Sequence, residues 1–414
     1  MNASQTVVLA TRPQASGPLP VNKSNLQYNV SLGYLRAFIT VLVVAHHAAL
    51  AYHPFAPPSP ASLVAQPRLW PAFPVVDNAH WSGFALLVGF NDVFFMSLMF
   101  FLSGLFVWKS LQHKGARAFL RDRVVRLGVP FVVAAALLAP LAYYPTYLTT
   151  PSHSGLAGFW QQWRSLGNWP AGPAWFIWVL LAFDCVATAL FLVLPKWGEA
   201  LGRMTARASR RPAVFFGLVI ALSALAYIPM ELKFTGFDWA SWGPFFFQTS
   251  RIVHYLVYFM LGAGVGALGI GKGLLAPDGK LARRWILRAV AALVAFIVET
   301  AAVIAVFSPH ASPRPWELAA DCGFVLSCAA SSFAFLALFI RFARRRSKIW
   351  DSLTANAYGI YLVHYAFVSW LQYSLLKTTL PGIAKGSLVL FGALVLSWGT
   401  VASLRRIPVV ARVI

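Results

Sequence analysis

The stretch LGYLRAFITVLVVAHHAALAY, residues 32–52, decides the fold class of this chain. It is long enough to cross a bilayer as a helix, and it holds two ionisable side chains, Arg36 and His47, where such groups are costly. His47 follows Arg36 by eleven positions, so in a helix the two point within about 20° of each other, roughly 16 Å apart along the axis. His46 points about 80° away from that line. We therefore expect Arg36 and His47 to share one polar face inside a membrane bundle.

Long apolar segments recur along the rest of the chain. With 59% apolar and 11% charged residues among 414, the composition excludes a soluble globular protein. The alternation typical of membrane strands is missing, so we expect an all-α, polytopic bundle of about ten transmembrane helices. The expected spans are 32–52, 84–108, 124–147, 173–195, 213–231, 251–270, 283–307, 320–341, 353–376 and 387–407. The transmembrane domain then covers 32–407, between a disordered cytoplasmic leader at 1–31 and a cytoplasmic tail at 408–414.

The net charge of +22 follows this topology. One set of alternate loops and the C-terminal tail carries 23 Lys and Arg residues, and the loops on the opposite side carry six. The first set comprises 109–126, 196–212, 271–284, 341–351 and the tail 405–414. An excess of positive charge marks the cytoplasmic side, so we expect both termini in the cytoplasm. Topology accounts for the charge and no basic-aromatic pattern accompanies it, so we expect no nucleic-acid partner. No His, Glu or Cys spacing typical of a metal site occurs, and we expect no metal.

Three ionisable residues near the first two spans suit group transfer. His47 can take a proton from an attacking hydroxyl, and Arg36, nearer the cytoplasm, can bind a phosphate or carboxylate. Asp92, at the outer start of the second span, can orient the imidazole or bind a sugar hydroxyl. The alternatives are a histidine satisfied by a neighbouring helix, an arginine extended to the headgroups, and an acid stabilised by the helix dipole.

Further candidates lie on later spans. Arg123 and Arg126 form an i, i+3 pair at the base of the third span, although basic inner loops are generic. His364 follows Tyr361 and Tyr358 on one stripe of the ninth span, and His254 lies at the outer end of the sixth. Ordinary interhelical polar contacts are the alternative for these residues. Tryptophans in the outer loops suit either interfacial anchoring or stacking on sugar rings; they are Trp70, Trp81, Trp160, Trp163, Trp169, Trp239 and Trp242.

The order and spacing of four motifs resemble the acyltransferase-3 family of membrane acyltransferases, and in particular its branch that modifies periplasmic glucans. The first is Arg36 with His47 after ten intervening residues. The others are NDVFFMSLMFFLSGLF at 91–106, GPAWFIW at 172–178 and NAYGIYLVH at 356–364. This resemblance implies a multi-pass protein of the bacterial inner membrane. It also implies transfer of a succinyl or acetyl group from cytoplasmic acyl-CoA to a hydroxyl of a glucan or other envelope glycan.

The resemblance also assigns roles to residues. His47 is the implied catalytic residue, with Asp92 in support and His46 as a rival chosen against by spacing alone. The resemblance also places an Arg-x-x-Arg motif on Arg123 and Arg126. Together with the chemistry of the side chains, it leads us to expect acyl-CoA at Arg36, Arg123, Arg126, Tyr358, Tyr361 and His364, and the acceptor at His254 and Trp175. Direct transfer and an acyl-histidine intermediate both fit. A homodimer is compatible with the sequence. The main alternative function is a transporter that exports a glycan or small anion along the same polar face.

Overall fold

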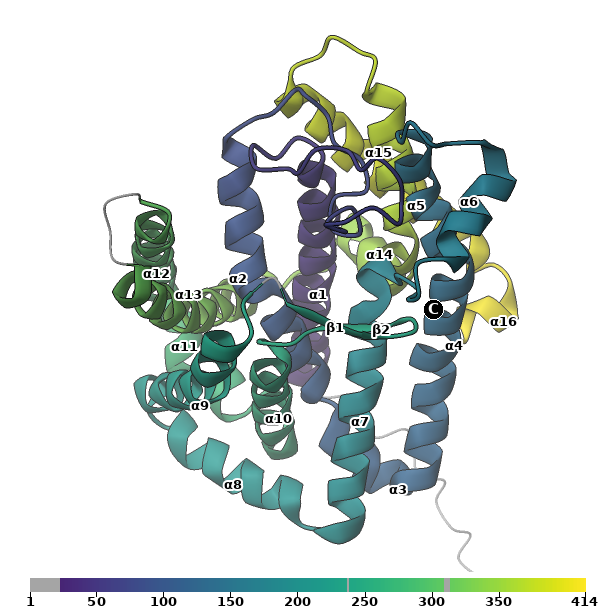
Figure 1. The fold of residues 1–414 in the computed structure, drawn as a ribbon. Helices are drawn as coiled ribbons and strands as arrows, with labels where there is room; N and C mark the ends of the chain where they lie inside the picture. Colours follow the sequence, from purple (N-terminus) through teal and green to yellow (C-terminus); the bar gives the residue numbers. More distant parts are fainter. Residues whose placement is uncertain (1–22, 237, 309–312) are drawn as a thin grey trace, which may run out of the picture.

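The computed structural model describes residues 23–236, 238–308 and 313–414, and it is mostly helical (Figure 1). The long helices are α1 (Lys23–Leu50), α2 (Gly83–Gly104), α3 (Val107–Arg123), α7 (Trp175–Val193), α9 (Pro212–Lys233), α10 (Ile252–Leu268), α12 (Trp285–Val306), α13 (Pro313–Phe342), α14 (Lys348–Leu375) and α15 (Gly382–Leu404). The shorter helices are η1 (Val124–Gly128), α4 (Val129–Val133), η2 (Ala134–Leu138), α5 (Ala139–Leu148), α6 (Gly155–Arg164), η3 (Gly172–Ala174), α8 (Trp197–Ser209), η4 (Gly273–Leu275), α11 (Lys280–Arg283) and α16 (Pro408–Ala411).

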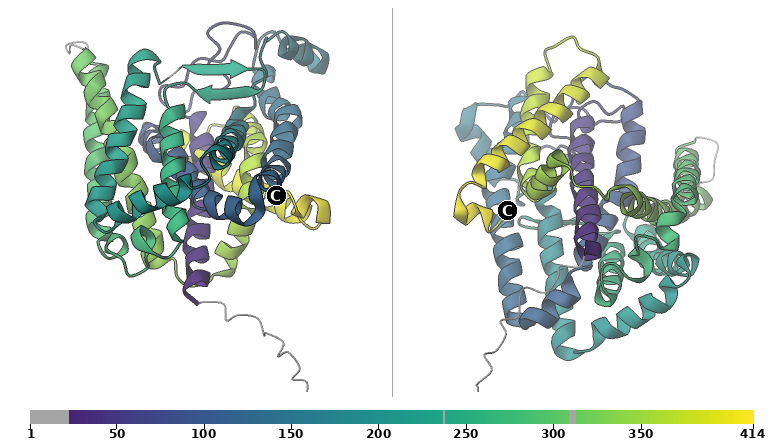
Figure 2. Two further views of the ribbon diagram at one scale, coloured as in Figure 1. Left: turned by 90° about the horizontal axis from the view of Figure 1, so that it is seen from below. Right: turned by 180° about the vertical axis from the view of Figure 1, so that it is seen from behind.

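Helix α1 is central. It packs against α2, α13, α14 and α15, and the view from behind in Figure 2 shows it running between its neighbours. In the most apolar part of each helix, 78% of α13 is buried, against 22% of α12 and of α15. Apolar side chains that the bundle leaves exposed suit contact with lipid. Helix α13 is therefore an inner helix of the bundle, and α12 and α15 are outer ones.

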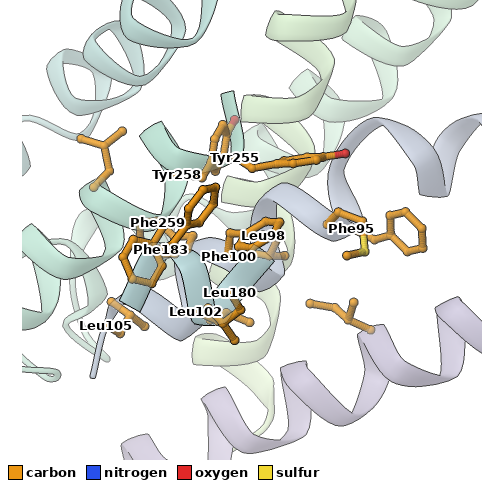
Figure 3. Close-up of a cluster of buried hydrophobic side chains, with 14 of the residues drawn as sticks. Phe95, Leu98, Phe100, Leu102, Leu105, Leu180, Phe183, Tyr255, Tyr258 and Phe259 are labelled. Atoms are coloured by element: carbon orange, nitrogen blue, oxygen red, sulfur yellow. The ribbon is translucent and has the colours of Figure 1, made fainter. Parts of the chain in front are cut away.

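Helices α2 and α10 approach closely through glycines. A Cβ atom at Gly262 or Gly266 of α10 would overlap the backbone of Phe101 or Leu105 of α2, and one at Gly104 would overlap that of Phe259. Small residues four positions apart are a common device for packing helices in membranes. Around this contact lies an aromatic and aliphatic core to which α2, α7 and α10 contribute (Figure 3).

The number of spans differs from the expected ten. Among the described residues, eight helices are long and apolar enough to cross a membrane. The number rises to nine when α10 and Gly273–Arg283, which are bent by 83° relative to each other, are counted as one span. Helix α14 occupies the ninth expected position but is not among them, because it carries more polar side chains. It packs against α1, α5 and α15, so protein can satisfy those polar groups.

Four local features also depart from expectation. The expected basic loop 109–126 lies mostly within the amphipathic helix α3 (Val107–Arg123), which Gly115 interrupts with φ of +75°. The all-α prediction missed an antiparallel hairpin of β1 (Trp239–Trp242) and β2 (Phe245–Gln248), with Trp239 opposite Gln248. Helix α1 begins at Lys23, within the expected leader, and residues 1–22 of that leader lie outside the described part. The short helix α16 begins the expected tail.

Contacts between segments far apart in sequence define one end of the bundle, here called the basic end. Ser31 donates to the carbonyl of Ala343, and the guanidinium of Arg344 donates to the carbonyl of Pro277 at 2.7 Å. Helices α3 and α8 lie at the same end, at the bottom of Figure 1. The opposite end carries loop 51–82, helix α6 and the turn before α15.

Candidate active site

The imidazoles of His47 on α1 and His364 on α14 meet inside the bundle. Nδ1 of His47 lies 3.2 Å from Nε2 of His364 and 2.8 Å from the carbonyl oxygen of Val43, one helical turn earlier. Nδ1 of His364 lies 2.7 Å from the carbonyl oxygen of Tyr361. His364 is fully buried, whereas His47 is partly exposed. We refer to His47 and His364 as the histidine pair.

These contacts assign the hydrogens of the neutral rings. A carbonyl oxygen can only accept, so Nδ1 of each histidine carries the hydrogen that faces Val43 or Tyr361. Nε2 of neutral His364 then holds a lone pair, so the single Nδ1–H of His47 is shared between this nitrogen and the carbonyl oxygen of Val43. Nε2 of His47 is left with its own lone pair, and no described residue forms a hydrogen bond with it. The histidine pair therefore presents one free basic nitrogen in a partly open position.

Two residues that the sequence did not single out brace the histidine pair. Nε2 of Gln372 donates to the carbonyl of His47 at 2.9 Å, and the ring of Tyr365 stands edge-on to the His47 imidazole with centroids 5.0 Å apart. The hydroxyl of Tyr365 donates in turn to the carbonyl of Pro71 in the loop above. Gln372 follows His364 by eight positions of α14, so the two side chains point about 80° apart around the helix. Helical spacing therefore gave no signal for the role of Gln372.

The expected support of His47 by Asp92 has a different geometry. The carboxylate of Asp92 pairs with the guanidinium of Arg251 at 2.7 Å, and among the described residues no hydrogen bond joins it to His47. The imidazole that senses the charges of Asp92 and Arg251 is that of His46. His46 itself packs against the rings of His47 and Phe95, with both centroid distances 5.3 Å. The partner that orients His47 is His364, which sequence analysis had assigned to the donor.

Arg36 and Arg126 form an unneutralised cationic site toward the basic end. The guanidinium of Arg36 lies over the ring of Phe106 at 5.6 Å, and it is close enough to Arg126 for their charges to repel. The hydroxyl of Tyr358 donates to the carbonyl of Arg126 at 2.6 Å, so α14 is tied to this site. Neither guanidinium has a carboxylate partner in the part of the chain that the structure describes. Two such cations favour an anionic ligand.

Arg123 and Arg126 do not act as the pair expected from their spacing. Arg123 forms an ion pair with Asp184 of α7 at 3.2 Å, and the Asp184 side chain is 1% exposed. The π-helical turn η1 begins directly after Arg123 and widens the helix, so the two arginines turn toward different neighbours. Arg123 is thus held by a buried carboxylate, and Arg126 is left beside Arg36.

Tyr361 and Trp175 brace the start of α7. The hydroxyl of Tyr361 donates to the carbonyl of Pro173, directly before the helix. The ring of Trp175 packs edge-on against Trp239 of the β hairpin, with centroids 5.8 Å apart, and against Tyr255 of α10. Trp178, one turn later, donates to the carbonyl of Phe246 at 2.8 Å. These contacts join α7, α10, α14 and the hairpin around the histidine pair.

His254 lies in a separate buried cluster. Its Nε2 is 3.1 Å from the hydroxyl of Ser97 and 3.6 Å from the thiol of Cys328, and its ring packs against Tyr258. The side chain is fully buried. No contact joins His254 to His47 among the described residues, so His254, which we expected on the acceptor side, lies apart from the histidine pair.

Comparison with known proteins places the chain in a family. A family model described as an acyltransferase domain, of the acyltransferase-3 type, matches residues 29–402. No curated protein and no solved structure matches the chain. The matched region contains α2 to α14 complete and both members of the histidine pair. The chain belongs to the acyltransferase-3 family and is a multi-pass membrane acyltransferase.

Proposed function

We propose that this enzyme transfers an acyl group from acyl-CoA to a carbohydrate hydroxyl, with Nε2 of His47 as the base. The observation that supports the proposal is the hydrogen assignment of the histidine pair, which leaves this nitrogen with a lone pair. Its partner His364 is buried and holds the imidazole in one tautomer. A base prepared in this way is what general-base catalysis of an acyl transfer requires.

The reaction follows from that arrangement. Nε2 of His47 takes the proton of the acceptor hydroxyl while its oxygen attacks the thioester carbon. The new carbon–oxygen bond forms, the carbon–sulfur bond breaks, and the leaving thiolate receives the proton from His47. In the second route Nε2 attacks the thioester itself and later passes the acyl group to the hydroxyl. Trapping an acylated protein with labelled acyl-CoA and no acceptor distinguishes the two routes.

The donor enters from the basic end in this proposal. Arg36 and Arg126 supply cations for the phosphates of CoA, and the positive charge of this end favours its placement in the cytoplasm, with both termini. His47 follows Arg36 by eleven positions of one helix, roughly 16 Å along its axis. The thioester can therefore reach His47 while the phosphates stay near the basic end.

The acceptor approaches from the opposite end. Trp81 in loop 51–82 and two tryptophans of the β hairpin offer open rings for stacking on sugars: Trp81, Trp239 and Trp242 are 40%, 47% and 81% exposed. Trp70 and Trp163 pack inside a buried aromatic cluster and are excluded from this role and from anchoring in the headgroups. A glucan or another envelope glycan as acceptor, and succinyl or acetyl as the acyl group, rest on the family branch that the motifs resemble.

The test uses purified protein, labelled succinyl-CoA or acetyl-CoA, and an envelope glycan fraction. We expect label in the glycan that depends on the protein and on both substrates. The alternative function, glycan or anion export, predicts movement of solute into proteoliposomes without acylation. Transport together with an absence of CoA-dependent labelling would contradict the proposal.

A further inference from the structure

A hollow of about 410 Å³ lies at the basic end, away from the histidine pair. It opens between the ends of α8 and α10 and the chain that follows α10. The residues that line it are Ala206, Ser209, Arg210, Pro212, Leu268, Lys272, Gly273, Leu274, Lys280 and Leu281. The hollow thus combines apolar walls with three cations that converge from separate segments.

The three cations are not neutralised within the protein. Arg210, Lys272 and Lys280 are exposed, and none of them forms an ion pair with another described residue. The single acid between residues 269 and 284, Asp278, pairs with Arg344 at 3.6 Å instead. Positive charge at this end is expected from topology alone. Topology does not explain why three cations converge on one hollow that holds no carboxylate.

Ser209 adds an unsatisfied polar group to the same hollow. The residue is 6% exposed, and its hydroxyl has no hydrogen-bond partner among the described residues. A buried hydroxyl without a partner is uncommon in folded proteins and calls for a ligand or water. Gly273 lies directly beside it, since a Cβ atom there would stand 3.8 Å from Cβ of Ser209. The hydroxyl is therefore placed where the hollow meets the glycine-containing chain.

The chain beside Ser209 is a turn in which two glycines flank a lysine. Gly271 and Gly273 flank Lys272 and adopt φ of +114° and +66°, a conformation that other residues rarely take. Over residues 269–275 the N–H of Gly271 donates to no backbone carbonyl, whereas that of Lys272 bonds to Gly269. The turn therefore presents the ammonium of Lys272 and one free N–H beside the hollow.

The hollow connects to the site of Arg36 through α3. A Cβ atom on Gly269 would stand 3.4 Å from Nζ of Lys109, so a fourth cation borders the loop. Lys109 lies three positions after Phe106, whose ring packs against the guanidinium of Arg36. A row of cations therefore leads from the hollow to the arginine that lies on the same helix as His47.

We propose that this hollow binds a phosphate ester through Lys272, Lys280, Arg210 and the hydroxyl of Ser209. Two phosphate esters occur at this face of a membrane, the nucleotide end of acyl-CoA and an anionic lipid headgroup. The row of cations toward Arg36 favours the nucleotide, and that choice of source rests on the proposed function. The phosphate site itself does not depend on it.

The experiment measures binding to the purified full-length chain in detergent. Adenosine 3′,5′-bisphosphate, which lacks the thioester arm, is titrated by calorimetry, and retention of phosphatidylglycerol is followed by native mass spectrometry. We expect Lys272→Ala and Lys280→Ala each to weaken binding by about tenfold or more, as for loss of a charge-assisted contact. Lys196→Ala is the matched control, because Lys196 is an exposed lysine at the other end of α8 and removes the same charge.

Ser209→Ala tests the site without changing charge. Removing an unpaired hydroxyl should leave the thermal midpoint of the free protein unchanged or higher, yet weaken binding several-fold. Nucleotide binding that is lost in the hollow variants and kept in Lys196→Ala supports the proposal with CoA as source. If phosphatidylglycerol alone is lost in the hollow variants and kept in Lys196→Ala, the phosphate site is supported and its ligand is the lipid headgroup. Equal effects of the control and hollow variants, or no binding of either probe, would overturn it. His47→Ala should bind adenosine 3′,5′-bisphosphate normally, which separates this result from any failure of the transferase proposal.

Discussion

Nε2 of His364 lies 3.2 Å from Nδ1 of His47, although 317 positions separate the two residues in the chain. The contact joins α1 to α14 and fixes which nitrogen of His47 stays free. His364 is fully buried and anchored to the carbonyl of Tyr361, so it acts on His47 and leaves reaction with the substrate to that residue. Its part in the proposed reaction is to position the base.

Replacing His364 tests this positioning. His364→Phe keeps a ring but leaves Nδ1–H of His47 with the carbonyl of Val43 as its one acceptor, and we expect kcat to fall by about 10²-fold or more with little change in KM for acyl-CoA. His364→Gln can offer a side-chain oxygen near the same place and should recover part of the loss. The acid limb of the plot of kcat/KM against pH should shift in both variants, because His47 no longer lies beside a second imidazole that can take up a proton. A merely structural role would lower stability alike in both and leave the limb in place.

The ion pair of Arg123 with Asp184 predicts that Arg123 stabilises the fold and that Arg126 binds the donor. Arg123→Ala leaves a buried carboxylate without its partner and should destabilise the protein by about 3–5 kcal/mol. The double variant Arg123→Ala with Asp184→Ala should regain most of that stability. Arg126→Ala should instead leave the thermal midpoint near wild type and weaken acyl-CoA binding. Thermal unfolding and CoA titration of the four proteins check this. Similar binding losses for both single arginine variants would contradict it.

Replacing Asp92 tests whether this residue stabilises the fold or orients the catalytic base. Its carboxylate pairs with Arg251, whose side chain is 10% exposed, so Asp92→Asn should lower the thermal midpoint by leaving a buried cation poorly matched. The acid limb of the pH–rate profile should stay where it is in the wild type, because no hydrogen bond joins Asp92 to His47. Measurement of both quantities on one preparation is sufficient. A shifted limb with an unchanged midpoint would restore Asp92 as the residue that orients the base.

How much the sequence could predict is clear from individual residues. The shared face of Arg36 and His47 follows from helix geometry alone, and the structure keeps both on α1. The contact of His47 with His364 could not be predicted, since it depends on how α1 and α14 pack. The divergence of Arg123 and Arg126 was hidden for a similar reason, because a π-helical turn leaves no clear mark in the sequence. Ion pairs between helices, such as those of Asp92 and Asp184, depend on the same packing.

The glycine contacts between α2 and α10 give a test of the fold. Gly266→Ala would drive a methyl group into the backbone of Leu105, and we expect a loss of about 1–3 kcal/mol from overpacking. Gly217→Ala is the matched control, because a Cβ atom at Gly217 of α9 meets open space. That change should be neutral or stabilise the helix slightly. Equal thermal midpoints for the two variants would mean that α2 and α10 do not pack in this way.

The most direct test compares acyl transfer by His47→Ala and His46→Ala, with labelled acyl-CoA and both proteins shown to be folded. His47 holds the free basic nitrogen, and His46 packs beside it without contact to His364 among the described residues. We expect the rate of His47→Ala to fall by about 10²–10⁴-fold, the usual contribution of a general base, and that of His46→Ala to stay within about tenfold of wild type. A wild-type rate for His47→Ala would contradict the assignment of His47 as the catalytic base.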